Sequence, residues 1–162
     1  MILATSLLIF ITVQRLGEVW LAGRNTRALK AKGAVESGGG HYGLMVALHA
    51  AWVICLWAFG WDRPVFLWWL ALFAAGQALR IWAIMTLGPR WTTRIIVQPQ
   101  APLVVTGPYR WIGHPNYVAV VVEIAALPMA LGLPWVALIF TALNAAMLRM
   151  RIKAENQALG LA

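Results

Sequence analysis

Residues 107–117 read GPYRWIGHPNY and lie between two strongly apolar halves of the chain. Gly107-Pro108 indicates a turn, because glycine tolerates unusual dihedral angles and proline fixes φ. Proline favours the first position of a helix and disfavours helical geometry in the residue before it, so the sequence predicts a helix that begins at Pro115 with His114 near its cap. An imidazole, an amide and a phenol would then lie at a helix N-terminus, which favours negatively charged groups. A plain polar loop between two membrane helices fits the local chemistry equally well.

The composition is that of a membrane protein. Of the 162 residues, 62% are hydrophobic and only 11% are charged, whereas about a quarter of a soluble domain is charged. The length suits a single domain, residues 1–162. The net charge of +8 comes from basic residues that flank apolar stretches, which indicates loop positioning and contact with anionic lipid rather than with nucleic acid. One cysteine, Cys55, excludes an internal disulfide and a multi-cysteine metal site, and we expect no metal.

Five apolar stretches approach the length of about 20 residues that crosses a bilayer. They cover about residues 1–21, 44–59, 65–87, 115–131 and 134–148. The loop from Arg24 to His41, the segment around residues 107–117 and the C-terminal tail are basic, while the two short turns hold one acid and one base. Since basic loops stay in the cytoplasm, the sequence predicts an all-α polytopic membrane protein with its N-terminus outside.

A few ionisable residues lie inside these stretches. Arg15 and Glu18 are three residues apart, so they share a helix face and can pair. Arg80 lies deep in the third stretch and needs a partner, for which Glu18 and Glu123 are the candidates. We interpret His49, in the second stretch, as a hydrogen-bonded packing residue rather than a ligand.

The hairpin formed by the last two stretches brings residues 107–117 close to Arg151 and Glu155. These two are four residues apart and would share one side of a continuing helix. Such a cluster can hold a charged amphiphile, with a carboxylate on N–H groups and Arg151 and an amine on Glu155. His41 and Tyr42, after a run of glycines, either line this site or belong to a solvated loop. No phosphate-binding loop, zinc-spaced set or serine-nucleophile motif is present.

GPYR at 107–110, HPNY at 114–117 and Arg151-Ile152 with Glu155 resemble the C-terminal signature of the isoprenylcysteine carboxyl methyltransferase family, integral membrane enzymes that use S-adenosylmethionine. Upstream, Gly33, Glu36, His41-Tyr42, Gln77, Arg80, Trp82, Gly88 and Trp91 look like the small bacterial branch of the family, which is associated with O-methylation of phenolic polyketide lipids. The chain departs from the usual pattern at Ala101, Gly113 and Asn156.

The resemblance implies a pocket for S-adenosylmethionine at the cytoplasmic end of the last two helices, within residues of about 98–162. The residues that match the family motif would bind it: Gly107, Tyr109, His114, Pro115, Asn116, Tyr117, Arg151 and Glu155. The resemblance also implies a lipid-like acceptor that enters sideways between helices. The likeness to the bacterial branch further implies a place in a bacterial cytoplasmic membrane, with the active site facing the cytoplasm.

A phenol acceptor would benefit from a base, because an aromatic hydroxyl ordinarily titrates near pH ~10. Glu123, His41 and His114 are the candidates for this base. Alternatively, Arg80 or Arg94 would stabilise the phenolate. We expect O-methylation of a phenolic polyketide lipid. Carboxyl methylation of a prenylated cysteine or a similar amphiphile, which needs no base, is the alternative. A small transporter or scaffold subunit is the alternative from another class, although the sequence lacks the internal repeat typical of transporters.

Overall fold

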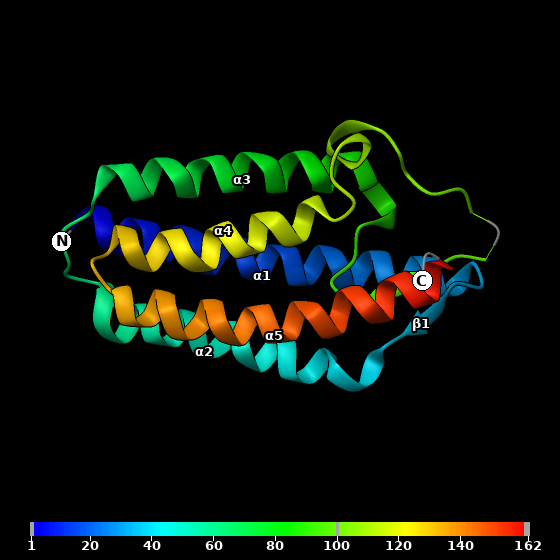
Figure 1. The fold of residues 1–162 in the computed structure, drawn as a ribbon, viewed down its shortest axis with the longest axis horizontal. Helices are drawn as coiled ribbons and strands as arrows, with labels where there is room; N and C mark the ends of the chain where they lie inside the picture. Colours follow the sequence, from blue (N-terminus) through cyan, green and yellow to red (C-terminus); the bar gives the residue numbers. More distant parts are fainter. Residues whose placement is uncertain (1, 100, 161–162) are drawn as a thin grey trace.

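Five helices run side by side along the long axis of the molecule (Figure 1). In chain order they are α1 (Ile2–Ala31), α2 (Tyr42–Gly60), α3 (Leu67–Leu87), α4 (Pro115–Ala130) and α5 (Pro134–Leu159). The computed structural model describes residues 2–99 and 101–160. Met1, Gln100, Leu161 and Ala162, which the single-domain prediction includes, lie outside the described residues. The predicted all-α architecture is confirmed.

The bundle has the dimensions of a membrane protein. By length and composition, four of the described helices (α1, α2, α3 and α5) can cross a membrane, and α4 is apolar but only 16 residues long. Large apolar side chains cover the outside of the bundle, among them Trp68, Met85 and Leu138, which are 89%, 75% and 73% exposed. Outward-facing apolar surface of this extent suits contact with lipid.

The core lies in the half of the bundle away from the long loops, where short turns join α2 to α3 and α4 to α5. All five helices contribute fully or nearly buried side chains to it: Leu8, Ile11, Trp52, Leu56, Phe73, Ile124, Leu127, Leu131, Val136 and Phe140. α4 packs tightly against α3, because a Cβ on Gly76 would lie 2.8 Å from the Val122 side chain.

The opposite end of the bundle carries the long connections (Figure 1). They contain β1 (Val35–Ser37), η1 (Gly39–His41), η2 (Gly88–Arg90), β2 (Ile95–Val97) and η3 (Gly107–Arg110). The two strands form an antiparallel pair in which Val35 lies opposite Val97 and Ser37 opposite Ile95. The C-terminal part of α5 reaches the same end, so all the basic segments of the chain gather there.

One helix boundary and one strand pairing differ from the sequence-based expectation. The loop expected to begin at Arg24 is helical up to Ala31, because residues 24–31 contain several good helix formers and the next glycine along the chain is Gly33. The pairing of Val35–Ser37 with Ile95–Val97 was not anticipated. Strands of three residues carry no usable periodicity, and these two are far apart in the sequence.

Candidate functional site

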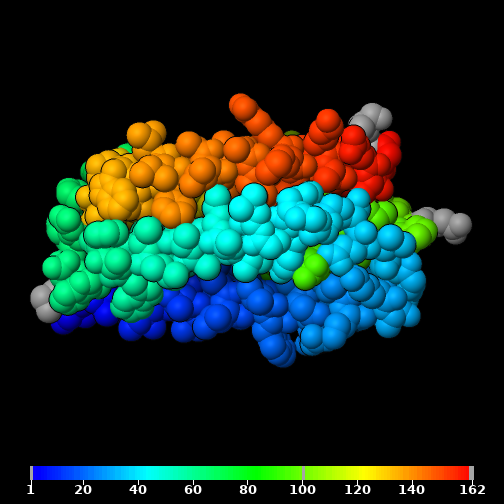
Figure 2. Space-filling view, turned by 90° about the horizontal axis from the view of Figure 1, so that it is seen from below, coloured from blue at the N-terminus to red at the C-terminus, as the bar shows by residue number. Residues whose placement is uncertain are grey.

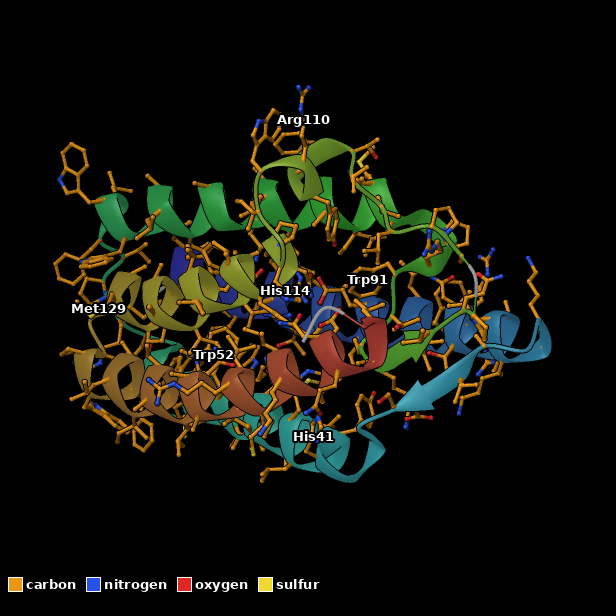
Figure 3. The ribbon with its side chains drawn as sticks, turned by 45° about the vertical axis from the view of Figure 1, so that its right-hand side comes forward. His41, Trp52, Trp91, Arg110, His114 and Met129 are labelled. Atoms are coloured by element: carbon orange, nitrogen blue, oxygen red, sulfur yellow. The ribbon has the colours of Figure 1, made fainter. Side chains whose placement is uncertain are left out.

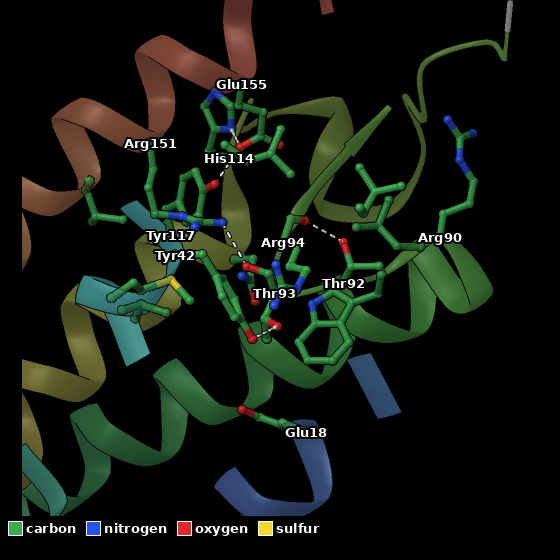
Figure 4. Close-up of a pocket in the computed structure, with 18 of the residues that line it drawn as sticks. Glu18, Tyr42, Arg90, Thr92, Thr93, Arg94, His114, Tyr117, Arg151 and Glu155 are labelled. Carbon is green, nitrogen blue, oxygen red and sulfur yellow. Dashed lines mark hydrogen bonds and ion pairs between the residues drawn. The ribbon is translucent and has the colours of Figure 1, made fainter. Parts of the chain in front are cut away.

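A cavity of about 420 Å³ lies at the loop end of the bundle. All five helices, β2 and the segment before η3 line it, and its volume falls within the range of about 300–1,000 Å³ that is typical of small-molecule sites. We call the part nearest the loops the outer half and the part toward the middle of the bundle the inner half. Figure 4 shows part of the lining, including Tyr117, Arg151 and Glu155.

The N-terminus of α4 meets the C-terminal part of α5 in the outer half. The Tyr117 hydroxyl donates a hydrogen bond to Glu155 Oε2 at 2.5 Å. His114 occupies the N-cap position of α4, but its side chain makes no capping hydrogen bond. Instead its Nε2 lies 3.2 Å from Asn156 Oδ1 and its Nδ1 lies 3.7 Å from Glu155 Oε2. The helix start predicted at Pro115 is confirmed, and the imidazole at that start reaches across to α5.

Arg151 is a buried cation with spare hydrogen-bonding capacity. Its side chain comes from α5, the residue is 3% exposed, and Nη2 donates to the Thr93 carbonyl at 2.9 Å. Nε and Nη1 have no hydrogen-bond partner among the residues that the structure describes, and the guanidinium lies 5.9 Å from the Tyr117 ring centroid. A buried charge with unpaired donors is costly. The geometry therefore favours an anionic group at this point of the cavity.

Tyr109 contributes a phenol from η3 to the outer half. Burial, with the charge of Glu155 adding to it, raises the pKa of Tyr109 well above its ordinary value. The hydroxyl therefore remains protonated at neutral pH and is available as a hydrogen-bond donor.

A network of four charged side chains lies in the inner half. Arg80 donates to both carboxylate oxygens of Glu18, at 2.5 and 2.6 Å, and to Glu123 Oε2 at 3.2 Å. Arg15 bridges the same two carboxylates, at 3.0 Å from Glu18 and 2.5 Å from Glu123. The predicted pairing of Arg15 with Glu18 is confirmed, and both carboxylates expected as partners of Arg80 contact it.

The sequence matches the model of the isoprenylcysteine carboxyl methyltransferase (ICMT) family over residues 69–160. The chain belongs to this family. It is also 35% identical to a protein of Bacillus subtilis (strain 168) whose name is given as "Uncharacterized protein YpbQ", and the alignment covers 94% of each chain. No solved structure matches the present chain. ICMT-family proteins are membrane methyltransferases that use S-adenosylmethionine, and the matched segment contains Tyr109, Tyr117, Arg151 and Glu155 of the outer half.

The cavity brings together most of the residues that the sequence singled out. Those that line it are Arg80, Arg94, Tyr109, His114, Asn116, Tyr117, Arg151 and Glu155. Four predicted residues do not line it: His41, Gly107, Pro115 and Glu123.

Each of these four has another place in the fold. Glu123 is fully buried and its Oε2 is held by Arg15 and Arg80. His41 lies at the end of η1, just before α2 (Figure 3). Gly107 has a φ of +56° and approaches α3 closely, since a Cβ there would lie only 2.4 Å from Thr86 Oγ1. Pro115 is the first residue of α4.

Sequence reasoning missed two polar residues of the inner half, His49 and Asn144, which both line the cavity. His49 lies seven residues after Tyr42 in α2, and Asn144 lies seven residues before Arg151 in α5. Residues seven apart share a helix face two turns along. The spacing of Asn144 from Arg151, and of His49 from Tyr42 as a candidate lining residue, was therefore a usable signal.

Proposed function

We propose that this chain transfers a methyl group from S-adenosylmethionine to a hydroxyl group of a lipid in the membrane, with a phenolic polyketide lipid as the acceptor. The observation that carries the proposal is the buried Arg151, which has two unpartnered N–H groups and lies near Glu155 in a cavity surrounded by lipid-facing helices.

The outer half of the cavity fits the amino-acid part of the methyl donor. Arg151 Nε and Nη1 are available for a carboxylate, and such charge-assisted bonds are among the stronger ones in proteins. Glu155 Oε2 accepts from Tyr117, which leaves Oε1 for an ammonium group. Asn116 Oδ1 is buried without a partner among the described residues and is a further acceptor. When bound, S-adenosylmethionine supplies a methyl group on a positively charged sulfur.

The inner half fits the head of an amphiphile. Val120, Met147 and Leu148 line it with apolar surface. Val19 of α1 and Val46 of α2 also line the cavity, although they are 56% and 44% exposed on the outside of the bundle. The cavity thus approaches the lipid-facing surface between α1 and α2, which lie next to each other in Figure 2. We infer that the acceptor enters there from the bilayer.

The segments at the mouth of the cavity position the reactants and exclude water. β2 lines the cavity, and Arg94, just before it, places its guanidinium 3.9 Å from the Tyr42 ring centroid. The Tyr42 hydroxyl lies 3.2 Å from Thr93 Oγ1, which joins the start of α2 to the same segment. Methyl transfer is an in-line displacement, so holding the two reactants in line and keeping water out contribute most of what the protein must do.

Carboxyl methylation of a prenylated cysteine is the second candidate. Arg15 and Arg80 line the inner half, and guanidinium groups suit a carboxylate. A carboxylate acceptor would need no base, whereas a hydroxyl acceptor would. Which of the two acceptors the protein methylates therefore decides between the two functions.

The test of the donor site is calorimetric titration of the detergent-purified protein with S-adenosylhomocysteine. We expect saturable binding by the wild type. Arg151→Met and Glu155→Gln should each weaken it by about 10-fold to 100-fold, since a hydrogen bond to a charged group contributes about 1.5–3 kcal/mol.

Lys153→Gln is the matched control, because Lys153 is exposed on the same helix and does not line the cavity. We expect it to bind as the wild type does. A folded wild-type protein that does not bind S-adenosylhomocysteine would refute the proposed function, and unchanged affinity in both site variants would refute the assignment of the pocket.

A further inference from the structure

The inner half of the cavity holds two polar side chains that the charge network does not use, His49 and Asn144. Each lies seven residues deeper along its helix than a residue of the mouth or outer half, Tyr42 for His49 and Arg151 for Asn144. Seven helical residues span about 10 Å. A ligand that reaches from Arg151 toward the middle of the bundle therefore passes the level of both side chains.

The hydrogen bond of His49 fixes which of its ring nitrogens carries the proton. Nδ1 lies 2.9 Å from the Met45 carbonyl oxygen, four residues earlier in α2. A carbonyl oxygen can only accept, so Nδ1 must donate. In the neutral ring Nε2 then presents a lone pair. No other described residue forms a hydrogen bond with Nε2, and the ring lines the cavity.

Asn144 is buried, at 1% exposure, and neither Oδ1 nor Nδ2 has a partner within residues 2–99 and 101–160. An unpartnered amide in such a place costs about 1–3 kcal/mol for each group left unsatisfied. The residue lines the cavity on α5, which packs against α2. A group that both donates and accepts hydrogen bonds would satisfy it, and a hydroxyl is such a group.

The other histidine and the carboxylates that line the cavity are already engaged. Glu18 from α1 is held by Arg15 and Arg80. Glu155 accepts from Tyr117, and His114 lies within hydrogen-bonding distance of Asn156. Among the histidines and carboxylates of the described chain that line the cavity, His49 is the one whose ring nitrogen is left free as a base.

We propose that His49 Nε2 takes the proton of a hydroxyl acceptor and that the Asn144 amide orients this hydroxyl. The inference rests on the proposed function and adds to it the residue that takes the hydroxyl proton and the residue that orients the hydroxyl. The acceptor oxygen forms a bond to the methyl carbon as the sulfur–methyl bond breaks. The electron pair of that bond stays on the sulfur, which loses its positive charge, and the hydroxyl proton moves to His49 Nε2.

The charged groups that share the cavity with His49 are mostly cations, which favour negative charge on the acceptor oxygen and oppose positive charge on the imidazole. Arg15 from α1, Arg80 from α3 and Arg151 from α5 line the same cavity, together with Glu18. The two guanidinium groups of the inner half are positioned to stabilise negative charge that develops on the acceptor oxygen. The proton leaves His49 to water through the mouth of the cavity after the product departs.

The test compares His49→Gln with the wild type in the full chain, with a long-chain alkylresorcinol as acceptor and S-adenosylmethionine as donor. Glutamine keeps a polar side chain of similar reach but cannot take the proton. We expect the turnover number to fall by about 100-fold to 10,000-fold, the usual contribution of a general base. The affinity for S-adenosylhomocysteine should stay at the wild-type value, and the acidic limb of the pH–rate profile should disappear.

A second readout does not depend on turnover. The chain has three histidines, so nitrogen-15 labelling of histidine gives a spectrum that single substitutions can assign. Adding the alkylresorcinol with S-adenosylhomocysteine should shift the His49 Nε2 signal of the wild type, and Asn144→Leu should reduce this shift. Leu44→Ala, an exposed position of α2 that does not line the cavity, is the control for helix perturbation and should leave both readouts unchanged.

The outcomes separate this inference from the proposed function. A wild type that does not bind S-adenosylhomocysteine rejects the proposed function itself. The wild type could instead bind S-adenosylhomocysteine but methylate only an S-prenylated N-acetylcysteine, at a rate that His49→Gln does not change. That result overturns the inference about His49 but keeps the conclusion that the protein is a methyltransferase. Loss of alkylresorcinol turnover in His41→Gln instead of His49→Gln also overturns it. Should His49→Gln fail to fold, His49→Asn and the wild-type nitrogen-15 shift decide the question.

Discussion

Arg80 uses its planar guanidinium to hold two carboxylates at once in the middle of the bundle. It is 3% exposed, contacts Glu18 through two parallel hydrogen bonds and reaches Glu123 with its third nitrogen. Lysine could not reproduce this fork geometry. The arrangement joins α1, α3 and α4 at the base of the cavity, so we regard Glu123 as a residue that positions Arg15 and Arg80 rather than as the base.

We predict that Arg80→Met lowers the free energy of unfolding by about 3–5 kcal/mol, because it leaves buried carboxylate charge incompletely paired. Chemical unfolding in detergent measures the change. Arg63→Met is the control, since Arg63 is exposed in the turn between α2 and α3 and pairs only with the Phe59 carbonyl among the described residues. It should change stability by no more than about 0.5 kcal/mol. Equal stability of the two variants would mean that the buried network adds nothing to folding.

For single residues, the sequence predicted which side chains form ion pairs better than it predicted which side chains line the cavity. The pairing of Arg15, Glu18, Arg80 and Glu123 follows from helical spacing and from the cost of leaving a charge unpaired in the membrane. Whether a polar side chain faces the cavity depends on how each helix is rotated in the bundle. His49 was for that reason interpreted as a packing residue, although it lines the cavity.

The β1–β2 pair is the element that connects the outer ends of the helices. Glu36 in β1 forms ion pairs with Lys30 at the end of α1 and with Arg94 just before β2. The hydrogen bonds from Lys30 and Arg94 hold the pKa of the Glu36 carboxyl below its ordinary value. A lowered folded-state pKa means that the link stabilises the pair above the ordinary carboxyl pKa and that this contribution is lost as the pH falls through the lowered pKa.

We therefore predict that amide protection of Val35–Ser37 and Ile95–Val97 stays constant from about pH 7 to about pH 5. The protection should decrease once the pH drops below the ordinary carboxyl pKa of ~4.3. Glu36→Gln should show low protection already at about pH 7 and no further loss on acidification. Hydrogen exchange, corrected for the intrinsic effect of pH, measures both. Asp62→Asn, in the turn at the opposite end of the bundle, should behave as the wild type. If Glu36→Gln retains the acid-dependent loss, another group controls the strand pair.

Elements with a strong helical signal were predictable and short ones were not. The starts of α4 and α5 follow from prolines that begin them. The extension of α1 to Ala31 was missed because basic residues were interpreted as a loop, although they are also good helix formers. The strand pair joins two segments that lie far apart in the sequence, and a local pattern does not show such a pairing.

Charge and architecture agree across the whole molecule. The cavity lies at the end of the bundle that carries the basic segments, whereas the opposite end has short turns and Arg63 as its basic residue among the described positions. Positive charge is retained on the cytoplasmic side of a membrane. We infer that the cavity opens toward the cytoplasm, where S-adenosylmethionine is made, and that the apolar acceptor reaches it from the lipid phase. In the proposed function, one molecule joins a water-soluble and a lipid-soluble reactant in a single cavity.

Labelling of single cysteines tests this orientation. The one native cysteine, Cys55, lies within α2 and is replaced by alanine. Arg63→Cys and Arg110→Cys then place a thiol in opposite halves of the bundle, and both positions are exposed, with Arg110 projecting sideways from the helices in Figure 3. A membrane-impermeant maleimide added to intact bacterial cells expressing the protein should label the Arg63→Cys variant at once and the Arg110→Cys variant only after the cells are opened. The reverse pattern would place the cavity outside, where the donor is absent, and would contradict the proposed route of both reactants.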